Sequence, residues 1–257
     1  MNRLQSELSR LFLPRSVGDA EAPGLIDPKG KVRAMVLELA RPADWDVLSK
    51  VWRAVQTELE LPAPAIAVSG TDGLQLWFSL SELVSVPQAH AFLESLRLHF
   101  LADIAPKRLR LMPVLDPSSP QQARHAPAVP AEQDQTGNWS AFVAPDLAPV
   151  FADTPWLDIP PSNDGQADLL SRLSSIKPSA FEAALEWLRP VPTEPAGVTR
   201  ETTSINADRM PDRPAASVGS LAAKRFLLQV MNDETVALAL RIEAAKALLP
   251  YADEHRP

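Results

Sequence analysis

The stretch that most constrains the fold of this 257-residue chain is residues 64–80, PAIAVSGTDGLQLWFSL, which predicts two strands joined by a glycine-bearing turn. In the second strand, apolar residues at every other position alternate with Gln75, Trp77 and Ser79, which is the strand period of two. The turn runs from Ser69 to Gly73. It places a hydroxyl group at one end of the hairpin and the amide of Gln75 on the neighbouring strand.

The segments on either side of this hairpin predict an α+β fold. Residues 31–40 are apolar on both faces and predict a central strand. Apolar residues at three- and four-residue steps predict helices over 43–60 and 87–101, and residues 107–114 predict a further strand. The order strand, helix, hairpin, helix, strand is typical of a mixed sheet covered by helices.

The remainder of the chain divides into two parts by composition. Its expected elements are a helix at 3–12, a loop at 115–137, a short strand at 139–143, and helices at 165–176 and 179–188. We expect residues 1–188 to form the α+β domain, in which the mixed sheet is followed by a helical region that contains the helices at 165–176 and 179–188. Residues 189–217 are proline-rich and predict a linker, and 218–257 predict a C-terminal helical hairpin. Because two short helices bury little surface alone, segment 218–251 is a candidate protein-binding segment.

Composition excludes several functional classes. The chain has no cysteine, which excludes disulfides, thiolate metal sites and cysteine nucleophiles. Its four histidines are scattered without ligand spacing, and its net charge of −7 disfavours non-specific binding to duplex nucleic acid. There is no apolar signal core and no apolar run of membrane length, so we expect a cytoplasmic protein with no membrane partner.

Residues 35–113 resemble the polymerase domains of the archaeo-eukaryotic primase superfamily, especially the bacterial ligase-associated type. That family combines an acidic-x-acidic metal motif on a strand, a helix, and a Ser/Thr-Gly-x-x-Gly-x-His signature on a strand–turn–strand. The first motif falls here on Leu37-Glu38-Leu39-Ala40 and the second on Ser69-Gly70-Thr71-Asp72-Gly73-Leu74-Gln75. The resemblance implies a primase-polymerase-like core over about a third of the chain.

The chain departs from the family at the positions that carry the chemistry. Ala40 stands where the family has its second metal carboxylate, and Gln75 stands where it has its phosphate-binding histidine. Residues 108–114 include no acidic residue, and Asp116 lies just beyond them. Because two-metal nucleotidyl transfer needs several converging carboxylates, we expect a degenerate site without a cofactor. Magnesium or manganese is expected only if the chain is an enzyme with a rearranged site using Glu38 and Asp72 or Asp116.

The candidate site residues fall into two sets. The candidate ligand-binding residues are Ser69, Gly70, Thr71, Gly73, Gln75, Trp77, Arg108 and Arg110, and Glu38 is a weak candidate metal ligand. Each has a structural alternative: the glycines only turn the chain, Trp77 packs under a helix, and Glu38 pairs with Arg108 or Arg110.

The C-terminal segment resembles part of phage terminase small-subunit-like proteins, through VMND at 230–233 and RIEAAKALLPY at 241–251. Together these features favour a catalytically degenerate primase-polymerase-like module. Its expected role is weak binding of single-stranded nucleic acid or nucleotide, or scaffolding, in a replication or mobile-element context. The alternatives are an active nucleotidyltransferase and a protein-interaction module without a nucleic-acid role.

Overall fold

The computed structural model describes residues 2–14, 24–116 and 119–189, and these residues confirm the α+β class. In chain order the elements are α1 (Arg3–Leu11), β1 (Lys31–Ala40), α2 (Trp45–Thr57), β2 (Ala65–Val68), β3 (Gly73–Ser85), α3 (Val86–Phe100), η1 (Pro106–Arg108), β4 (Leu109–Met112), β5 (Val114–Asp116), β6 (Ser119–Arg124), β7 (Ala141–Val143), η2 (Ala148–Phe151), α4 (Asn163–Ser171) and α5 (Pro178–Trp187). The central strand and the hairpin form as the sequence predicts.

A five-stranded sheet in the order β4-β1-β3-β2-β7 organises the described part of the chain. Neighbouring strands in it run antiparallel, and one isolated parallel bridge joins Leu80 to Ile176. The prediction of a loop over 115–137 is wrong in part, since β5 and β6 pair as a separate two-stranded hairpin that extends into this range. The sequence of β6, SPQQAR, has no apolar alternation, so a pattern search cannot identify it as a strand.

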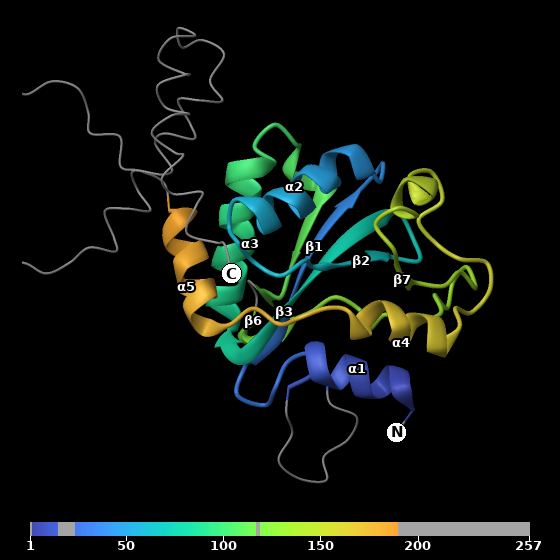
Figure 1. Cartoon of the computed structure of the whole chain (residues 1–257), viewed down its shortest axis with the longest axis horizontal. Coiled ribbons are helices and arrows are strands. Elements are labelled where there is room, and N and C mark those ends of the chain that lie inside the picture. The colour runs from blue at the N-terminus through green and yellow to red at the C-terminus, as the bar shows by residue number, and fades with distance from the viewer. Residues whose placement is uncertain (1, 15–23, 117–118, 190–257) are drawn as a thin grey trace, which may run out of the picture. The chain divides into compact units, whose positions relative to one another are not determined.

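Helices cover both faces of the sheet (Figure 1). On the first face, Leu48 of α2, Phe92 of α3 and Phe181 of α5 join the core formed by the alternate apolar residues of β1 and β3. On the second face, residues of α1 and α4 pack over Val36, Trp77 and their neighbours. Glu38 has the strand parity of Val36, so it also lies on the second face.

Two arginine side chains, the buried Arg33 and the exposed Arg10, fix α1 on that second face. Arg33 of β1 is only 3% exposed, and its guanidinium donates hydrogen bonds to carbonyls at the end of α1, at Ser9, Arg10 and Leu13. Arg10 of α1 donates to carbonyls at the C-terminal end of α4, including that of Leu170 at 2.9 Å. The hydrogen bonds of these two arginines therefore supplement the apolar packing between the first helix and the remainder of the domain.

The proposed linker at 189–217, apart from Arg189, and the proposed hairpin at 218–257 lie outside the described residues, as does the terminase-like segment. Within the described part of the chain, no helix has the length and apolar character needed to cross a membrane.

Candidate functional site

Strand register brings three of the sequence-predicted residues together at one end of the sheet. Glu38 of β1 pairs with Gln75 of β3 on one side and with Arg110 of β4 on the other. All three side chains lie on the second face, because directly opposed residues in antiparallel strands share a face. Glu38 and Gln75 are buried, at 6% and 3% exposed, whereas the Arg110 side chain is 36% exposed.

A chain of hydrogen bonds links these side chains to the hydrophobic core. The indole Nε1 of Trp77 donates to Oε1 of Gln75 at 2.8 Å, and Nε2 of Gln75 donates to Oε2 of Glu38 at 2.8 Å. An indole N–H can only donate, so it sets the amide orientation that turns Nε2 towards the carboxylate. Gln75 is therefore held as a donor to Glu38.

Arg110 connects Glu38 to a second carboxylate. Its Nη1 donates to Oε1 of Glu38 at 2.5 Å and to Oδ1 of Asp72 at 3.1 Å, and Arg41 reaches Asp72 at 3.5 Å. Burial disfavours the charged guanidinium, but the attraction of Glu38 and Asp72 outweighs it and raises the pKa of Arg110 above its ordinary value. One fixed positive charge thus lies between the two carboxylates.

The turn between β2 and β3 is closed by its own side chains. Oγ of Ser69 accepts hydrogen bonds from the amides of Thr71 at 3.2 Å and Gly73 at 3.0 Å. The amide of Gly70 donates to the carbonyl of Pro155 at 3.0 Å. These three amides belong to residues that the sequence proposed as ligand-binding, and each has a protein partner in this structure.

Close packing explains both glycines of the turn. Gly70 has φ +80°, and a Cβ there would lie 2.9 Å from Cγ of Gln133 and from the amide nitrogen of Ser140. A Cβ at Gly73 would lie 2.8 Å from Cγ and Oε1 of Glu38. The turn accordingly requires glycine at both positions whether or not it binds a ligand.

The other predicted arginine, Arg108, lies at the same end of the sheet but contacts backbone. Its Nη2 donates to the carbonyl of Pro42 at 2.8 Å. Beside it, Arg41 donates to the carbonyl of Lys107 at 3.2 Å and adopts φ +56°, an uncommon conformation for a residue with a Cβ. We call Arg41, Lys107, Arg108 and Arg110 the basic corner. Sequence reasoning missed Arg41, because no local pattern indicates its conformation or its contact with Asp72.

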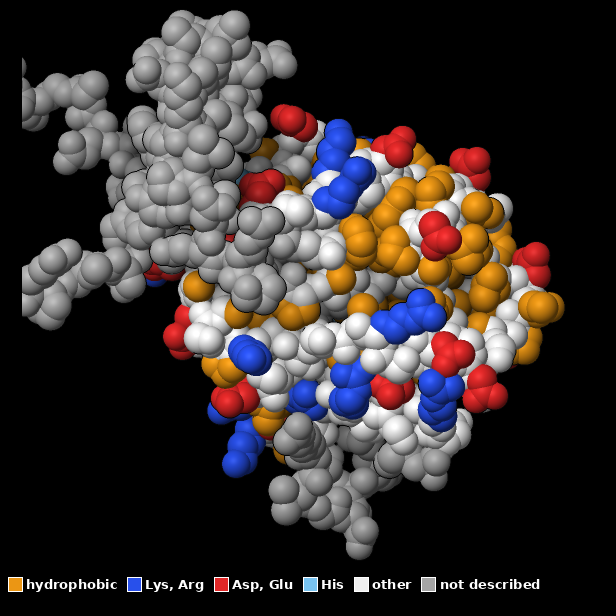
Figure 2. All heavy atoms as spheres, in the orientation of Figure 1, with side chains coloured by type: hydrophobic (Ala, Val, Ile, Leu, Met, Phe, Trp, Pro, Cys, Tyr) orange, Lys and Arg blue, Asp and Glu red, His pale blue; other side chains and the backbone are white. Residues whose placement is uncertain are grey.

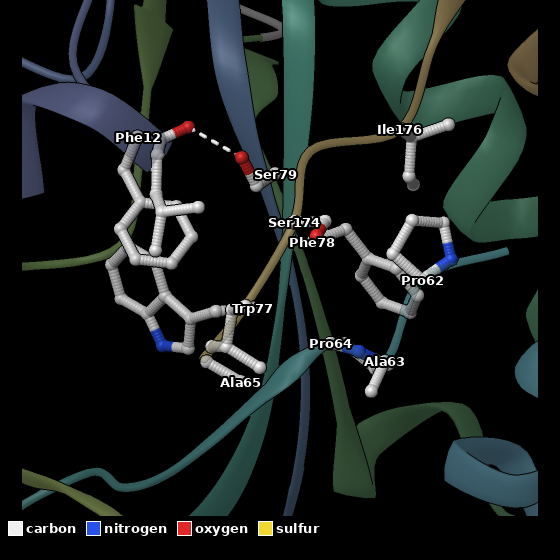
Figure 3. Close-up of a pocket in the computed structure, with 12 residues that line it drawn as sticks. Phe12, Pro62, Ala63, Pro64, Ala65, Trp77, Phe78, Ser79, Ser174 and Ile176 are labelled. Atoms are coloured by element: carbon white, nitrogen blue, oxygen red, sulfur yellow. Dashed lines mark hydrogen bonds between the residues drawn. The ribbon is translucent and has the colours of Figure 1, made fainter. Parts of the chain in front are cut away.

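Trp77, a candidate for base stacking, lies in the core at 2% exposed. Its ring contacts Phe12 and Phe142 edge-on, with centroids 5.3 Å and 5.8 Å away. Figure 3 shows it beside a cavity of about 10 Å³, where Ser79 Oγ donates to the carbonyl of Leu11 at 2.7 Å. That volume suits at most about one water molecule.

A larger apolar cavity of about 260 Å³ is also lined by Trp77, together with His125. The Nε2 of His125 is 3.0 Å from the carbonyl of Ala34, and its Nδ1 accepts from the amide of Ala126 at 2.8 Å. The second contact requires an unprotonated Nδ1, so Nε2 carries the proton. Burial lowers the pKa of His125 to about 4.

Glu38 and Asp72 are the carboxylates that converge at this site, and Arg110 lies between them. Within residues 2–14, 24–116 and 119–189, no group of three or more His, Asp or Glu side chains has the arrangement of a metal site. Asp116 belongs to β5, where its backbone pairs with Ser119. The site therefore consists of two carboxylates bridged by one partly exposed guanidinium.

Comparisons with known proteins include a distant structural neighbour. No protein-family model and no curated protein matches the chain. Among solved structures, the polymerase domain of ligase D from Mycobacterium tuberculosis, in complex with DNA, is similar at 18% identity and a TM-score of 0.34. The match covers 63% of this chain and 56% of that one, so the chain spans little more than half of its neighbour.

Proposed function

We propose that this chain is a catalytically inactive, primase-polymerase-like module that binds nucleic acid or nucleotide weakly, or acts as a scaffold, in a replication or mobile-element context. The observation that carries this proposal is the position of Arg110, which bridges Glu38 and Asp72. Those two residues lie in or beside the motifs that resemble the metal and phosphate motifs of the family.

The bridge is unfavourable for two-metal chemistry. Two divalent ions separated by about 4 Å need several carboxylates with free oxygens. Here one oxygen of Glu38 accepts from Arg110 and the other from Gln75. A divalent cation at this place would have to displace the guanidinium and would then lie close to its positive charge.

The basic corner supports the weak-binding part of the proposal. It contributes four cationic groups against the carboxylates of Glu38 and Asp72, and the Arg41 side chain is 57% exposed. A net excess of about two positive charges allows two or three phosphate contacts. The logarithm of affinity for a single strand would then fall with the logarithm of salt concentration at a slope of about −1.4 to −2.

The activity part is tested by primer extension with Mg²⁺ or Mn²⁺, on primed and unprimed templates, beside an active polymerase. We expect no nucleotide addition by the purified chain. Addition that Glu38→Gln abolishes would contradict the proposal.

The binding part is tested by titrating labelled single-stranded DNA at low salt. We expect Arg41→Gln/Lys107→Gln to weaken binding and to make its salt slope shallower. The matched control, Lys29→Gln/Lys50→Gln, removes two exposed cationic side chains from other surfaces and should change the affinity little. Equal loss in both variants would indicate that only overall charge matters.

A nucleotidyltransferase with a rearranged metal site is the second candidate. The specific observation in its favour is that Glu38, Asp72 and Gln75 come together at one end of the sheet. This function predicts that Arg110→Met, which frees the carboxylates, raises metal-dependent nucleotide addition. An inactive Arg110→Met variant that still folds would favour the non-catalytic module.

A further inference from the structure

An exposed apolar face lies on the segment that follows β7, outside the motifs discussed above. Leu147 and Val150 are 52% and 70% exposed, and Ile159 is 72% exposed. Leu147 and Val150 lie three residues apart on the tight turns around η2, so their side chains share one side. Figure 2 shows hydrophobic side chains gathered over η2 and the segment after it. We call residues 144–161 the η2 face.

The η2 face is acidic as well as apolar. Its sequence, APDLAPVFADTPWLDIPP, contains Asp146, Asp153 and Asp158 and no Lys, Arg or His. All three carboxylates are exposed, and none forms an ion pair with another described residue. In Figure 2, carboxylates lie within and around the hydrophobic area, whereas basic side chains lie at its borders towards α2 and α4.

This surface is built to keep its shape without a partner. Ala148 is fully buried and Phe151 packs against the main core, so η2 is anchored from beneath. The backbone of Leu157 exchanges two hydrogen bonds with Trp139, at 2.7 Å and 3.0 Å. A surface held in place in this way loses little conformational entropy when it binds a partner.

We propose that the η2 face binds a protein partner through a segment that has apolar side chains flanked by Lys or Arg. The apolar side chains would cover Leu147 and Val150, and the cations would pair with the exposed carboxylates of the η2 face. The same charge disfavours a second copy of this chain. In a two-fold contact the same face meets itself, which would place three carboxylates opposite three.

The test uses a fluorescein-labelled, 14-residue amphipathic peptide of leucine and lysine, with its leucine–glutamate counterpart as the charge control. Anisotropy titration of the full chain should show saturable binding of the lysine peptide and none of the glutamate peptide. Leu147→Ser/Val150→Ser should weaken binding at least about tenfold. Leu98→Ser is the matched control, since Leu98 is equally exposed, at 52%, but lies on α3.

A second pair of variants distinguishes binding at the η2 face from non-specific attraction of a cationic peptide to an acidic protein. Asp146→Asn/Asp153→Asn/Asp158→Asn should weaken binding and flatten its salt dependence. The control, Glu82→Gln/Asp103→Gln/Glu182→Gln, removes the same charge from exposed positions elsewhere and should leave binding intact. Equal loss in both, no binding of the lysine peptide, or a dimer that Leu147→Ser/Val150→Ser dissociates would each overturn the proposal.

Discussion

Removing the guanidinium of Arg110 should destabilise the fold by leaving a buried charge without its cation. The Glu38 side chain is 8% exposed and keeps only the hydrogen bond from Gln75 in the variant Arg110→Met. Breaking a fully buried pair costs ~3–5 kcal/mol. Because the Arg110 side chain is 36% exposed, water can partly replace it. We therefore expect a loss of about 2–3 kcal/mol, or roughly 4–12 °C in Tm.

A second substitution separates charge from packing. Arg110→Met/Glu38→Gln removes the uncompensated charge and keeps an acceptor for Gln75, so it should recover at least about half of the lost stability. Arg41→Met is the control, because its ion pair to Asp72 is long, at 3.5 Å, and its side chain is 57% exposed. Breaking that pair should cost less than about 1 kcal/mol.

Urea unfolding followed by tryptophan fluorescence, together with calorimetry of the full chain, measures all four proteins. Two results would refute the reasoning. One is a loss for Arg110→Met no larger than that for Arg41→Met. The other is a double variant no more stable than Arg110→Met alone, since either would show that Glu38 does not depend on Arg110.

Three further outcomes follow from contacts described above. Gly70→Ala should lower the free energy of unfolding by about 2–4 kcal/mol, because φ is positive there and the new Cβ would overlap backbone. Gly30→Ala is the control: Gly30 has φ +69° but open space around it, so the loss should be about 1 kcal/mol. Equal losses in urea unfolding would show that the overlap at Gly70 is relieved. Ser79→Ala should cost about 1–2 kcal/mol, because the Leu11 carbonyl loses its donor, and a loss near zero would mean that water replaces it. The pKa of His125 is about 4 in the folded chain against an ordinary value of 6.5. As the pH falls, the unfolded chain therefore binds this proton before the folded chain does. The free energy of unfolding then falls by about 1.4 kcal/mol per pH unit between pH 6.5 and pH 4. The difference in unfolding free energy between the wild type and His125→Gln should show that slope, and a difference independent of pH would contradict the burial of the imidazole.

The elements that sequence reasoning predicted well are those in which one period dominates. The alternation from Leu74 to Leu80 and the all-apolar run of β1 are local signals, and both strands form at those positions. The helix predicted over 43–60 ends earlier, at Thr57, and that over 87–101 forms as Val86–Phe100. The errors are at boundaries, where periodicity carries the least information.

The pairing of Glu38 was predicted only as a choice between two arginines. Parity along the strand predicted over 107–114 gives Arg108 and Arg110 the same face, so the sequence cannot separate them. The structure gives Arg110, because the β1–β4 register sets it opposite Glu38, while Arg108 lies at the end of η1 and contacts backbone. Register depends on contacts between strands distant in sequence, which no local pattern contains.

The contacts of Gln75 were not predictable for a similar reason. Its bond from Trp77 is local, at two residues, but its bond to Glu38 spans 37 residues. The sequence indicated the amide and the indole as neighbours on one face and left open whether they meet ligand or protein. Their burial is decided by α1, α4 and Phe142, which pack over that face.

The contact between α1 and α4 sets the order in which this domain can be completed during synthesis. Arg10 bonds to the carbonyl of Leu170, 160 residues later, and the apolar side of α1 packs on the same helix. At roughly 5–20 residues per second, that partner emerges about 8–30 seconds after α1 does. The leucines of the first helix therefore remain uncovered by α4 while most of the sheet is being made. This first helix is where a nascent-chain chaperone would have the longest time to act.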